Sequence, residues 1–295
     1  MIGPIGPIIQ AMRPHQWVKN LFVVAPLVFA EQALDAAHLV HAAAAFLVFS
    51  VLSGCVYILN DLVDVENDRL HPTKRFRPIA SGALPIMTAR TALAVALVGS
   101  IVASFIAFPT AFAAIGLAYF TLNVAYSFAL KHVPFVDVAC IASGFILRLI
   151  GGAVAVSVPI TPWIFGCTFL LALTLALGKR KHEILQAGEK KGEQRRVLER
   201  YDLGHVKLAM VGLAVATVLC YVAYTIFGSA AGRLFHPRDL AWTIPCVIFG
   251  LFRFVQLTDR AEDGRSPTDL MLRDGPFLAN LGVWSVVVLI VIYVR

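Results

Sequence analysis

The sequence predicts an all-α fold, a polytopic membrane bundle of about nine transmembrane helices in one domain, residues 1–295. Of the 295 residues, 59% are hydrophobic and only 15% are charged, and the mean hydropathy is +0.78. A soluble domain cannot bury that much apolar surface. Apolar stretches of bilayer length recur along the chain, and basic residues gather in alternate loops between them.

Nine apolar stretches have the length of roughly 17–25 residues that a bilayer core requires. Because the bilayer core offers no water to backbone polar groups, each stretch should be helical. In chain order they are about 17–34, 38–60, 91–108, 111–130, 136–157, 161–178, 206–228, 240–257 and 276–294. The first ten residues have neither a basic region nor a cleavage site, so we expect no removable signal peptide. The five cysteines all fall in apolar stretches without metal-ligand spacing, which favours small core residues.

The distribution of basic residues predicts the orientation of the chain. With the N-terminus in the cytoplasm, 21 of the 25 lysine and arginine residues fall on that side. The opposite loops hold only Arg233 and Arg238, together with the terminal Arg295. This positive-inside bias predicts a multi-pass protein of a bacterial inner membrane, with the N-terminus and active-site loops cytoplasmic and the C-terminus opposite. The net charge of +7 then reflects these loops, so we expect no nucleic-acid partner.

An acidic motif follows the second apolar stretch. On a helix, Asp61, Asp64 and Asp68 stand at i, i+3 and i+7 and share one face, which Asn60 flanks. Three carboxylates this close repel one another unless a cation lies between them. Mg²⁺ suits such a site because it prefers oxygen ligands and is often shared with a substrate's phosphates.

A basic run, Lys74, Arg75 and Arg77, comes directly after the acidic motif. Carboxylates followed by fixed positive charge are what a magnesium-bound diphosphate requires. The alternative is a solvated acidic and basic turn. The position at the end of a membrane helix favours the functional interpretation.

Six further residues are candidates for phosphate binding, each with a structural alternative. Lys19 lies one turn into the first stretch and either snorkels to the headgroups or contacts phosphate. Tyr126 is a binding residue or part of an aromatic belt. Arg148 lies deep in the fifth stretch, so it either pairs with a carboxylate or binds an anion. The others are Lys131, Lys179 and Arg180, at the cytoplasmic ends of the fourth and sixth stretches.

The loop after the eighth stretch has two features. Asp259 and Asp263 are four residues apart and form a weak second acidic pair, diluted by Arg260 and Arg265. The segment Ser266-Pro267-Thr268-Asp269 predicts a helix start.

A nine-helix membrane protein with Asn-Asp-x-x-Asp-x-x-x-Asp after its second span resembles the UbiA-type intramembrane prenyltransferase superfamily. The resemblance implies a UbiA-like fold and a polyprenyl diphosphate held through Mg²⁺ by two acidic motifs. The first motif is present as Asn60, Asp61, Asp64 and Asp68. The second, Asp-x-x-x-Asp after the sixth helix, is replaced by Gly-Lys-Arg-Lys-His-Glu at 178–183. Cations in place of that motif fit a donor that carries an additional phosphate.

Within that superfamily, the chain resembles the decaprenyl-phosphate phosphoribosyltransferase branch. The segments Arg-Pro-His-Gln-Trp-Val-Lys-Asn at 13–20 and His-Pro-Thr-Lys-Arg-Phe-Arg-Pro-Ile-Ala-Ser-Gly at 71–82 carry the resemblance. It implies transfer of 5-phosphoribosyl from 5-phosphoribosyl 1-diphosphate to a polyprenyl phosphate, with release of diphosphate, for cell-wall precursor synthesis. It also implies that Asp61, Asp64 and Asp68 hold Mg²⁺.

The resemblance assigns roles to the remaining candidates. Lys74, Arg75 and Arg77 would clamp the diphosphate, and Lys179 and Arg180 the 5-phosphate. The lipid phosphate would be held by Lys19, Tyr126, Lys131 or Arg148. The alternatives are a prenyltransferase that uses a polyprenyl diphosphate donor, with Asp259 and Asp263 as its second metal site, and a small-anion transporter. The sequence leaves a homo-oligomer open.

Overall fold

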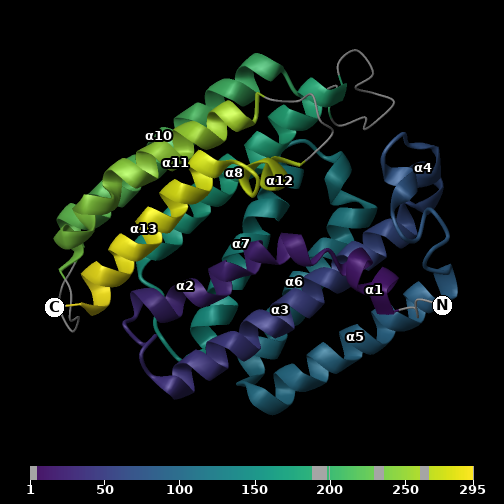
Figure 1. The fold of residues 1–295 in the computed structure, drawn as a ribbon, viewed down its shortest axis with the longest axis horizontal. Coiled ribbons are helices and arrows are strands. Elements are labelled where there is room, and N and C mark those ends of the chain that lie inside the picture. The colour runs from purple at the N-terminus through teal and green to yellow at the C-terminus, as the bar shows by residue number, and fades with distance from the viewer. Residues whose placement is uncertain (1–4, 188–197, 199, 229–235, 260–265, 295) are drawn as a thin grey trace. The chain divides into compact units, whose positions relative to one another are not determined.

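The computed structural model describes residues 5–187, 198, 200–228, 236–259 and 266–294, which are helical with short connections (Figure 1). The helices of the first half are α1 (Ile5–Met12), η1 (Pro14–Asn20), α2 (Leu21–Phe29), α3 (Ala36–Val63), α4 (Val65–Leu70), η2 (Lys74–Phe76), α5 (Ile86–Ala107), α6 (Thr110–Phe128) and η3 (Leu130–His132). Those of the second half are α7 (Val136–Ala155), α8 (Pro162–Ala187), α10 (Leu203–Phe227), η6 (Pro237–Thr243), α11 (Ile244–Leu257), α12 (Pro267–Met271) and α13 (Gly275–Tyr293).

Eight helical segments of the described residues are long and apolar enough to cross a membrane. They correspond to the second to ninth predicted stretches, so the all-helical, multi-pass prediction is confirmed. The first predicted stretch, 17–34, takes a different form: it is divided between η1 and the nine-residue α2. Arg13 has a left-handed backbone and Pro14 follows it, which ends α1 and starts η1.

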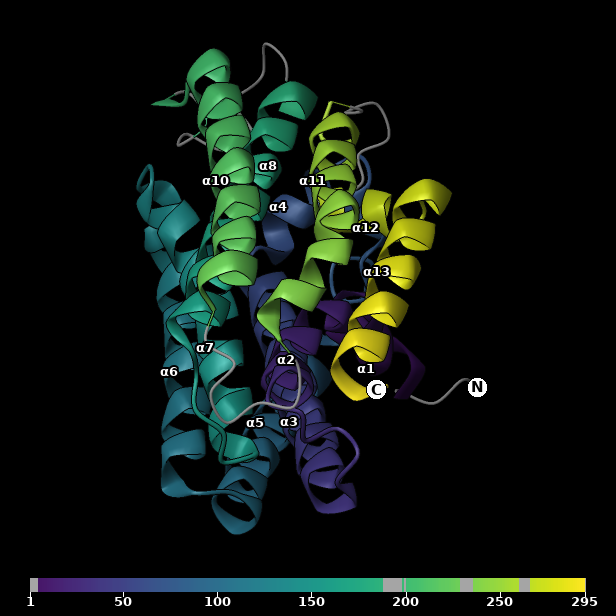
Figure 2. The same ribbon diagram turned by 90° about the vertical axis from the view of Figure 1, so that its left-hand side faces the viewer.

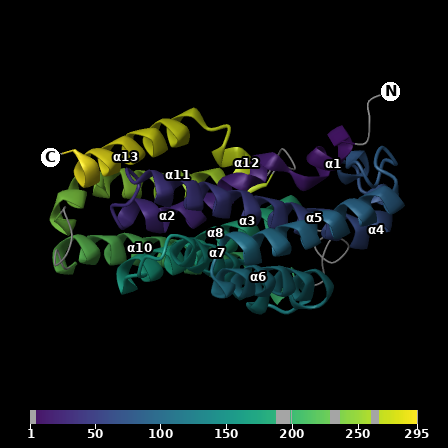
Figure 3. The ribbon, with the colours of Figure 1, turned by 90° about the horizontal axis from the view of Figure 1, so that it is seen from below.

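The divided N-terminal segment nevertheless follows α3 over most of its length. As the residue number rises along this segment, the residue number of the contacted position on α3 falls. Ala11 clusters with Ile58, Asn20 bonds to Ser50 and Ser53, and Val23 packs with Ala45 and Phe49. α1, η1 and α2 therefore lie antiparallel to α3, in the arrangement visible in Figures 1 and 3.

The chain forms two compact units. The first comprises Met1–Leu27, Ala33–Leu130 and Leu147–Pro159. Its core lies where α3 packs against α5 and α6, around buried Phe49, Phe112 and Tyr119. Close approach of α2 and α7 requires Gly152, because a Cβ there would meet the carbonyl oxygen of Val23 at 1.9 Å.

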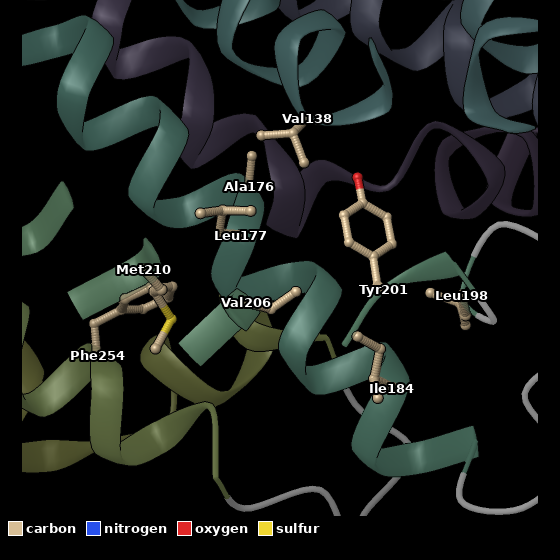
Figure 4. Close-up of a cluster of buried hydrophobic side chains, with 9 residues drawn as sticks. All are labelled: Val138, Ala176, Leu177, Ile184, Leu198, Tyr201, Val206, Met210 and Phe254. Carbon is tan, nitrogen blue, oxygen red and sulfur yellow. The ribbon is translucent and has the colours of Figure 1, made fainter. Parts of the chain in front are cut away.

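The second unit comprises Val28–Gln32, Lys131–Ile146 and Ile160–Arg295. Within it, α8 and α10 lie side by side (Figure 2), and α11 packs on α10 and on α13. A buried cluster packs residues of α7, α8, α10 and α11 together, and in Figure 4 Met210 and Phe254 lie next to each other within it. The predicted helix start at 266–269 is confirmed: Ser266 caps α12 in a capping box with Asp269.

Candidate active site

The acidic motif lies where α3 passes into α4. The helix is interrupted at Asp64, whose φ of −95° and ψ of 8° depart from helical geometry. The backbone bonds from Asp64 to Asn60 (2.9 Å) and from Asp68 to Asp64 (2.8 Å) nevertheless keep helical spacing across the break. The expectation of one uninterrupted helix through this motif is therefore wrong, although the chain continues in nearly the same direction after the break.

Asp61 and Asp68 are both buried, and arginine side chains hold them. Arg77 donates from one nitrogen to Asp61 Oδ1 at 3.2 Å and to Asp68 Oδ2 at 2.6 Å. Arg13 donates to the same Asp61 oxygen at 2.5 Å, and its guanidinium lies 5.0 Å from the Tyr57 ring centroid. Charge-assisted bonds of this length stabilise two carboxylates that are removed from water.

Arg13 is a site residue that the sequence analysis did not select. It stands 48 positions before Asp61, so no local spacing connects the two. The left-handed backbone of Arg13 lies at the turn between α1 and η1, where these two helices pack against α3. The structure therefore adds a second guanidinium to the predicted Arg77.

The oxygen atoms present are of the kind that Mg²⁺ binds. Asp61 is only 2% exposed, and its second oxygen, Oδ2, has no hydrogen-bond partner among the described residues. A buried carboxylate oxygen without a donor is a suitable ligand for a hard cation. No group of three or more His, Cys, Asp or Glu side chains in the described part of the chain is gathered around one point. The arginines occupy the positions between the carboxylates instead.

The other residues predicted near the motif have separate surroundings. Asn60 accepts a hydrogen bond from Ser127 Oγ, which joins the end of α3 to the end of α6. Arg75 is exposed and stacks on Phe76, with 4.8 Å to the ring centroid, and Lys74 is exposed beside it. The basic run is thus divided: Arg77 reaches the acidic motif, whereas the structure shows Arg75 against Phe76.

The loop between α4 and η2 is shaped by His71. Burial, followed by the charge of Lys74, lowers the pKa of His71 below its ordinary value. Its Nδ1 accepts hydrogen bonds from the backbone N–H of Thr73 at 3.2 Å and of Lys74 at 3.4 Å. A neutral ring is required for this acceptor role.

Arg148 lies in a buried polar network of the first unit. Its Nε donates to Asn20 Oδ1 at 2.7 Å, and a terminal nitrogen donates to the Tyr119 hydroxyl at 2.7 Å. Asn20 in turn donates to Ser50 and Ser53. The predicted alternatives were a carboxylate partner or an anion. The contacts described above are with neutral groups and with the Tyr119 ring, whose centroid lies 4.6 Å from the guanidinium, and both alternatives stay predictions.

This network lies well away from the acidic motif. Ser53 precedes Asp61 by eight residues on α3, and Tyr119 precedes Ser127, the partner of Asn60, by eight on α6. At a rise of 1.5 Å per residue, each separation is about 12 Å along the bundle. The network and the acidic motif thus stand at different levels of α3 and α6, and Tyr57, whose ring the Arg13 guanidinium contacts, lies between these levels on α3.

The remaining candidates of the N-terminal half are partly buried. Lys19 donates to Gln16 at 2.7 Å within η1. Tyr126 lies in the last turns of α6, and Lys131 follows in η3. The predicted contacts of these three residues with a lipid phosphate stay predictions.

In the second unit, Arg180 is fully buried. It pairs with Asp137 at 3.0 Å and donates to Glu183. The Tyr201 hydroxyl donates to the other Asp137 oxygen at 2.6 Å, and Figure 4 shows this hydroxyl directed toward the helix of Val138. Burial, followed by the bond to Asp137, raises the pKa of Tyr201. The guanidinium of Arg180 is thus buried and ion-paired in the structure, and its predicted contact with the donor's 5-phosphate stays a prediction.

Lys179 and Lys181 flank Arg180 and differ in exposure. The Lys179 side chain is 44% exposed and lies 4.0 Å from Glu183. Lys181 is buried and pairs with Asp259 at 2.6 Å and with the Thr258 hydroxyl at 3.2 Å. Asp263, the other member of the weak acidic pair, lies outside the described residues. The sequence analysis did not select Lys181, since its partner is 78 positions away.

Comparison with known proteins places the chain in a family. Residues 21–281 match the UbiA prenyltransferase family. The chain is 35% identical over 282 residues to decaprenyl-phosphate phosphoribosyltransferase of Mycolicibacterium smegmatis, covering 92% of this chain and 87% of that protein. It is 34% identical over 290 residues to the protein of the same name from Corynebacterium glutamicum, covering 97% and 86%.

A solved structure gives the same result for the fold. A UbiA homologue from Archaeoglobus fulgidus bound to DMAPP and Mg²⁺ has a TM-score of 0.73 at 18% identity, covering 98% of this chain and 99% of that chain. The resemblance drawn from the acidic motif and the helix count is thereby confirmed. The chain belongs to the UbiA prenyltransferase family.

Proposed function

We propose that the protein transfers 5-phosphoribosyl from 5-phosphoribosyl 1-diphosphate to a polyprenyl phosphate in the membrane, with release of diphosphate. The observation that carries this proposal is the near-full-length likeness to two decaprenyl-phosphate phosphoribosyltransferases, at 35% and 34% identity. The acceptor is a lipid, which agrees with a multi-pass chain whose acidic motif follows a candidate span.

We propose Mg²⁺ as the cofactor, held by Asp61 and Asp68 together with Asp64. The partnerless Oδ2 of Asp61 supports this assignment, as does the Mg²⁺ bound by the Archaeoglobus fulgidus relative. When bound, the ion would neutralise charge on the leaving diphosphate. Arg13 and Arg77 already lie on the carboxylates, so they are placed to exchange carboxylate for diphosphate oxygens.

The reaction requires few other groups from the protein. The acceptor phosphate is already an anion, so no side chain need remove a proton from it. The anomeric carbon develops positive charge as the diphosphate leaves, and fixed cations stabilise the leaving group. Asn60, held by Ser127, is placed to orient an adjacent carboxylate.

We assign the donor's 5-phosphate to Lys179, because it is the more exposed cation of the 178–183 segment. Arg180 supports that segment from within through Asp137 and Tyr201. Lys19, Tyr126 and Lys131 remain candidates for the lipid phosphate. Arg148 also remains a candidate for that role, although its hydrogen bonds to Asn20 and Tyr119 favour a structural one.

The competing function is a prenyltransferase with a polyprenyl diphosphate donor. It would require a second metal site from Asp259 and Asp263. Asp259 is paired with the buried Lys181, and the 178–183 segment, where the family's second acidic motif is expected, carries Lys179, Arg180 and Lys181 in place of aspartates. Against a small-anion transporter stands the relationship to transferases over more than nine-tenths of the chain.

Donor dependence tests the proposal directly. Purified protein in lipid nanodiscs is incubated with radiolabelled 5-phosphoribosyl 1-diphosphate, decaprenyl phosphate and Mg²⁺. We expect label in an acid-labile lipid and stoichiometric release of diphosphate. Turnover of a prenyl diphosphate instead, with no labelled lipid, would support the prenyltransferase.

Lys179→Ala tests the assignment of the 5-phosphate within the same assay. Loss of one phosphate contact should raise the KM for the donor about tenfold or more and leave the KM for the lipid unchanged. His205→Ala, an exposed change near the start of α10, is the matched control. An unchanged donor KM in Lys179→Ala would make the 178–183 segment a topology signal alone.

A further inference from the structure

The segment from Leu70 to Arg77 has two different sides. On one side, the buried Asp68 and the guanidinium of Arg77 belong to the acidic motif. On the other, Leu70 is 86% exposed and Phe76 is 68% exposed. Two exposed large apolar side chains in one short segment make it a candidate for a surface that something else covers.

Basic residues accompany these apolar side chains. The Arg75 guanidinium stacks over the Phe76 ring, and Lys74 is exposed next to it. Arg69 pairs with Glu66 at 2.9 Å, so those two charges offset each other. The exposed side therefore combines a leucine, an aromatic ring and two cations, the composition of an interfacial membrane contact.

The position in the chain keeps this side near a membrane surface. α3 ends at Val63 and α5 begins at Ile86, and both are candidate membrane spans. Leu70 is seven residues past the end of α3, and α4 takes up most of that interval (Figure 1). A helix advances only 1.5 Å per residue, so Leu70 lies within about 11 Å of the end of the span along the chain.

We propose that Leu70, Lys74, Arg75 and Phe76 form an interfacial tip, which inserts into the headgroup layer of the bilayer next to the acidic motif. Leu70 and Phe76 enter the boundary of the acyl chains, while Lys74 and Arg75 bind lipid phosphates. The tip would hold Arg77, Asp61 and Asp68 at the membrane depth of a lipid acceptor's phosphate. This role of the tip rests on the proposed function.

Depth can be measured without any enzyme activity. Phe76→Trp is reconstituted in vesicles of phosphatidylcholine and phosphatidylglycerol, and its fluorescence is compared with that of the unchanged chain. We expect the difference spectrum to be blue-shifted, quenched by lipids brominated near the headgroup, and protected from iodide. In Phe76→Trp combined with Arg75→Gln, the quenching should depend less on phosphatidylglycerol.

An emission quenched by iodide and insensitive to brominated lipid would overturn the proposal. Protection from iodide that disappears on dilution of protein in the vesicles would assign this surface to a second copy of the chain, which also overturns it. Neither result depends on the reaction catalysed, so failure here is distinguishable from failure of the proposed function.

Kinetics then test the purpose of the tip. Leu70→Ser with Phe76→Ser should raise the KM for polyprenyl phosphate in vesicles several-fold, whereas the KM for the water-soluble donor should not change. Leu34→Ser is the matched control, since Leu34 is 80% exposed just before the other end of α3. Equal lipid KM values for the double variant and the control would contradict the assigned purpose.

Discussion

At the residue scale, the buried carboxylates of both units are held by basic side chains. Asp61 and Asp68 share Arg77 in the first unit, and Asp137 pairs with Arg180 in the second. Removing one member of such a pair leaves a buried charge without compensation, which is strongly destabilising. A substitution at Asp61 or Arg180 would therefore change both the stability of the fold and the activity, so other residues are better probes of the mechanism.

Asp64 is the better probe of the acidic motif, because it lies at the helix break and is only partly buried, whereas Asp61 and Asp68 are buried. Asp64→Asn should lower turnover by orders of magnitude with little change in thermal stability, because it removes charge from the proposed metal site. Asp35→Asn, an exposed helix cap at the other end of α3, is the control. Near-normal turnover in Asp64→Asn would remove Asp64 from that site.

Tyr201 gives a prediction about pH. Its pKa is raised by burial and by Asp137, so the folded protein keeps the phenol proton at pH values where the unfolded chain has lost it. This contribution is complete below about pH 10 and is lost as the pH rises above that value. Stability in detergent should therefore fall above pH 10.

The variant Tyr201→Phe removes the contribution of the Tyr201 phenol to the pH dependence of stability. It should lower stability by about 1–3 kcal/mol at pH 8, because Asp137 loses a buried hydrogen bond. The further loss between pH 9 and 11 should be smaller than in the unchanged chain. Thermal unfolding curves over this range provide the comparison, and parallel pH dependences in the two proteins would rule out the assigned role.

At the element scale, the polar network around Arg148 fixes η1 against α3, α6 and α7. Asn20 is its centre, since it accepts from Arg148 and donates to Ser50 and Ser53. η1 starts beside Arg13, so the network also stabilises the element that carries this guanidinium to Asp61. We therefore expect Arg148 to position η1, and its predicted contact with a lipid phosphate is the alternative.

Two substitutions of Asn20 test that role. Asn20→Ala leaves several buried polar groups without a partner and should lower stability by about 1–3 kcal/mol. Asn20→Asp keeps the acceptor for Arg148 and should be the more stable variant, with an unchanged KM for the lipid. If Arg148 instead bound the lipid phosphate, the new carboxylate would compete with it and raise that KM. Thermal unfolding and lipid titrations distinguish the two roles.

Much of this architecture could be predicted from the sequence, because apolar length and the distribution of charge are local properties. The eight long helices, the cap at Ser266 and the position of the acidic motif belong to this group. The pairing of Arg13 with Asp61 and of Lys181 with Asp259 could not, since each joins residues dozens of positions apart. The break at Asp64 carries no proline or glycine, so no breaker residue indicates it.

At the scale of the whole molecule, the number of membrane crossings decides which side each end of the chain occupies. Eight long helices alone would return the chain to the side on which it began. The divided segment of α1, η1 and α2 is the candidate for a ninth crossing, because it runs antiparallel to α3 from the level of Ile58 to that of Ala42. That interval of 16 residues corresponds to about 24 Å, most of a bilayer core.

We therefore predict nine crossings, with the N-terminus in the cytoplasm and the C-terminus outside. Alkaline phosphatase fused after Arg295 should be active, because it folds only outside the cytoplasm, and green fluorescent protein at the same place should be dark. The reverse pattern is expected for fusions in the loop between α6 and α7, which the positive-inside bias assigns to the cytoplasm. A bright C-terminal fluorescent fusion would mean that α1, η1 and α2 enter and leave on one side. The divided segment would then be re-entrant, although it follows α3.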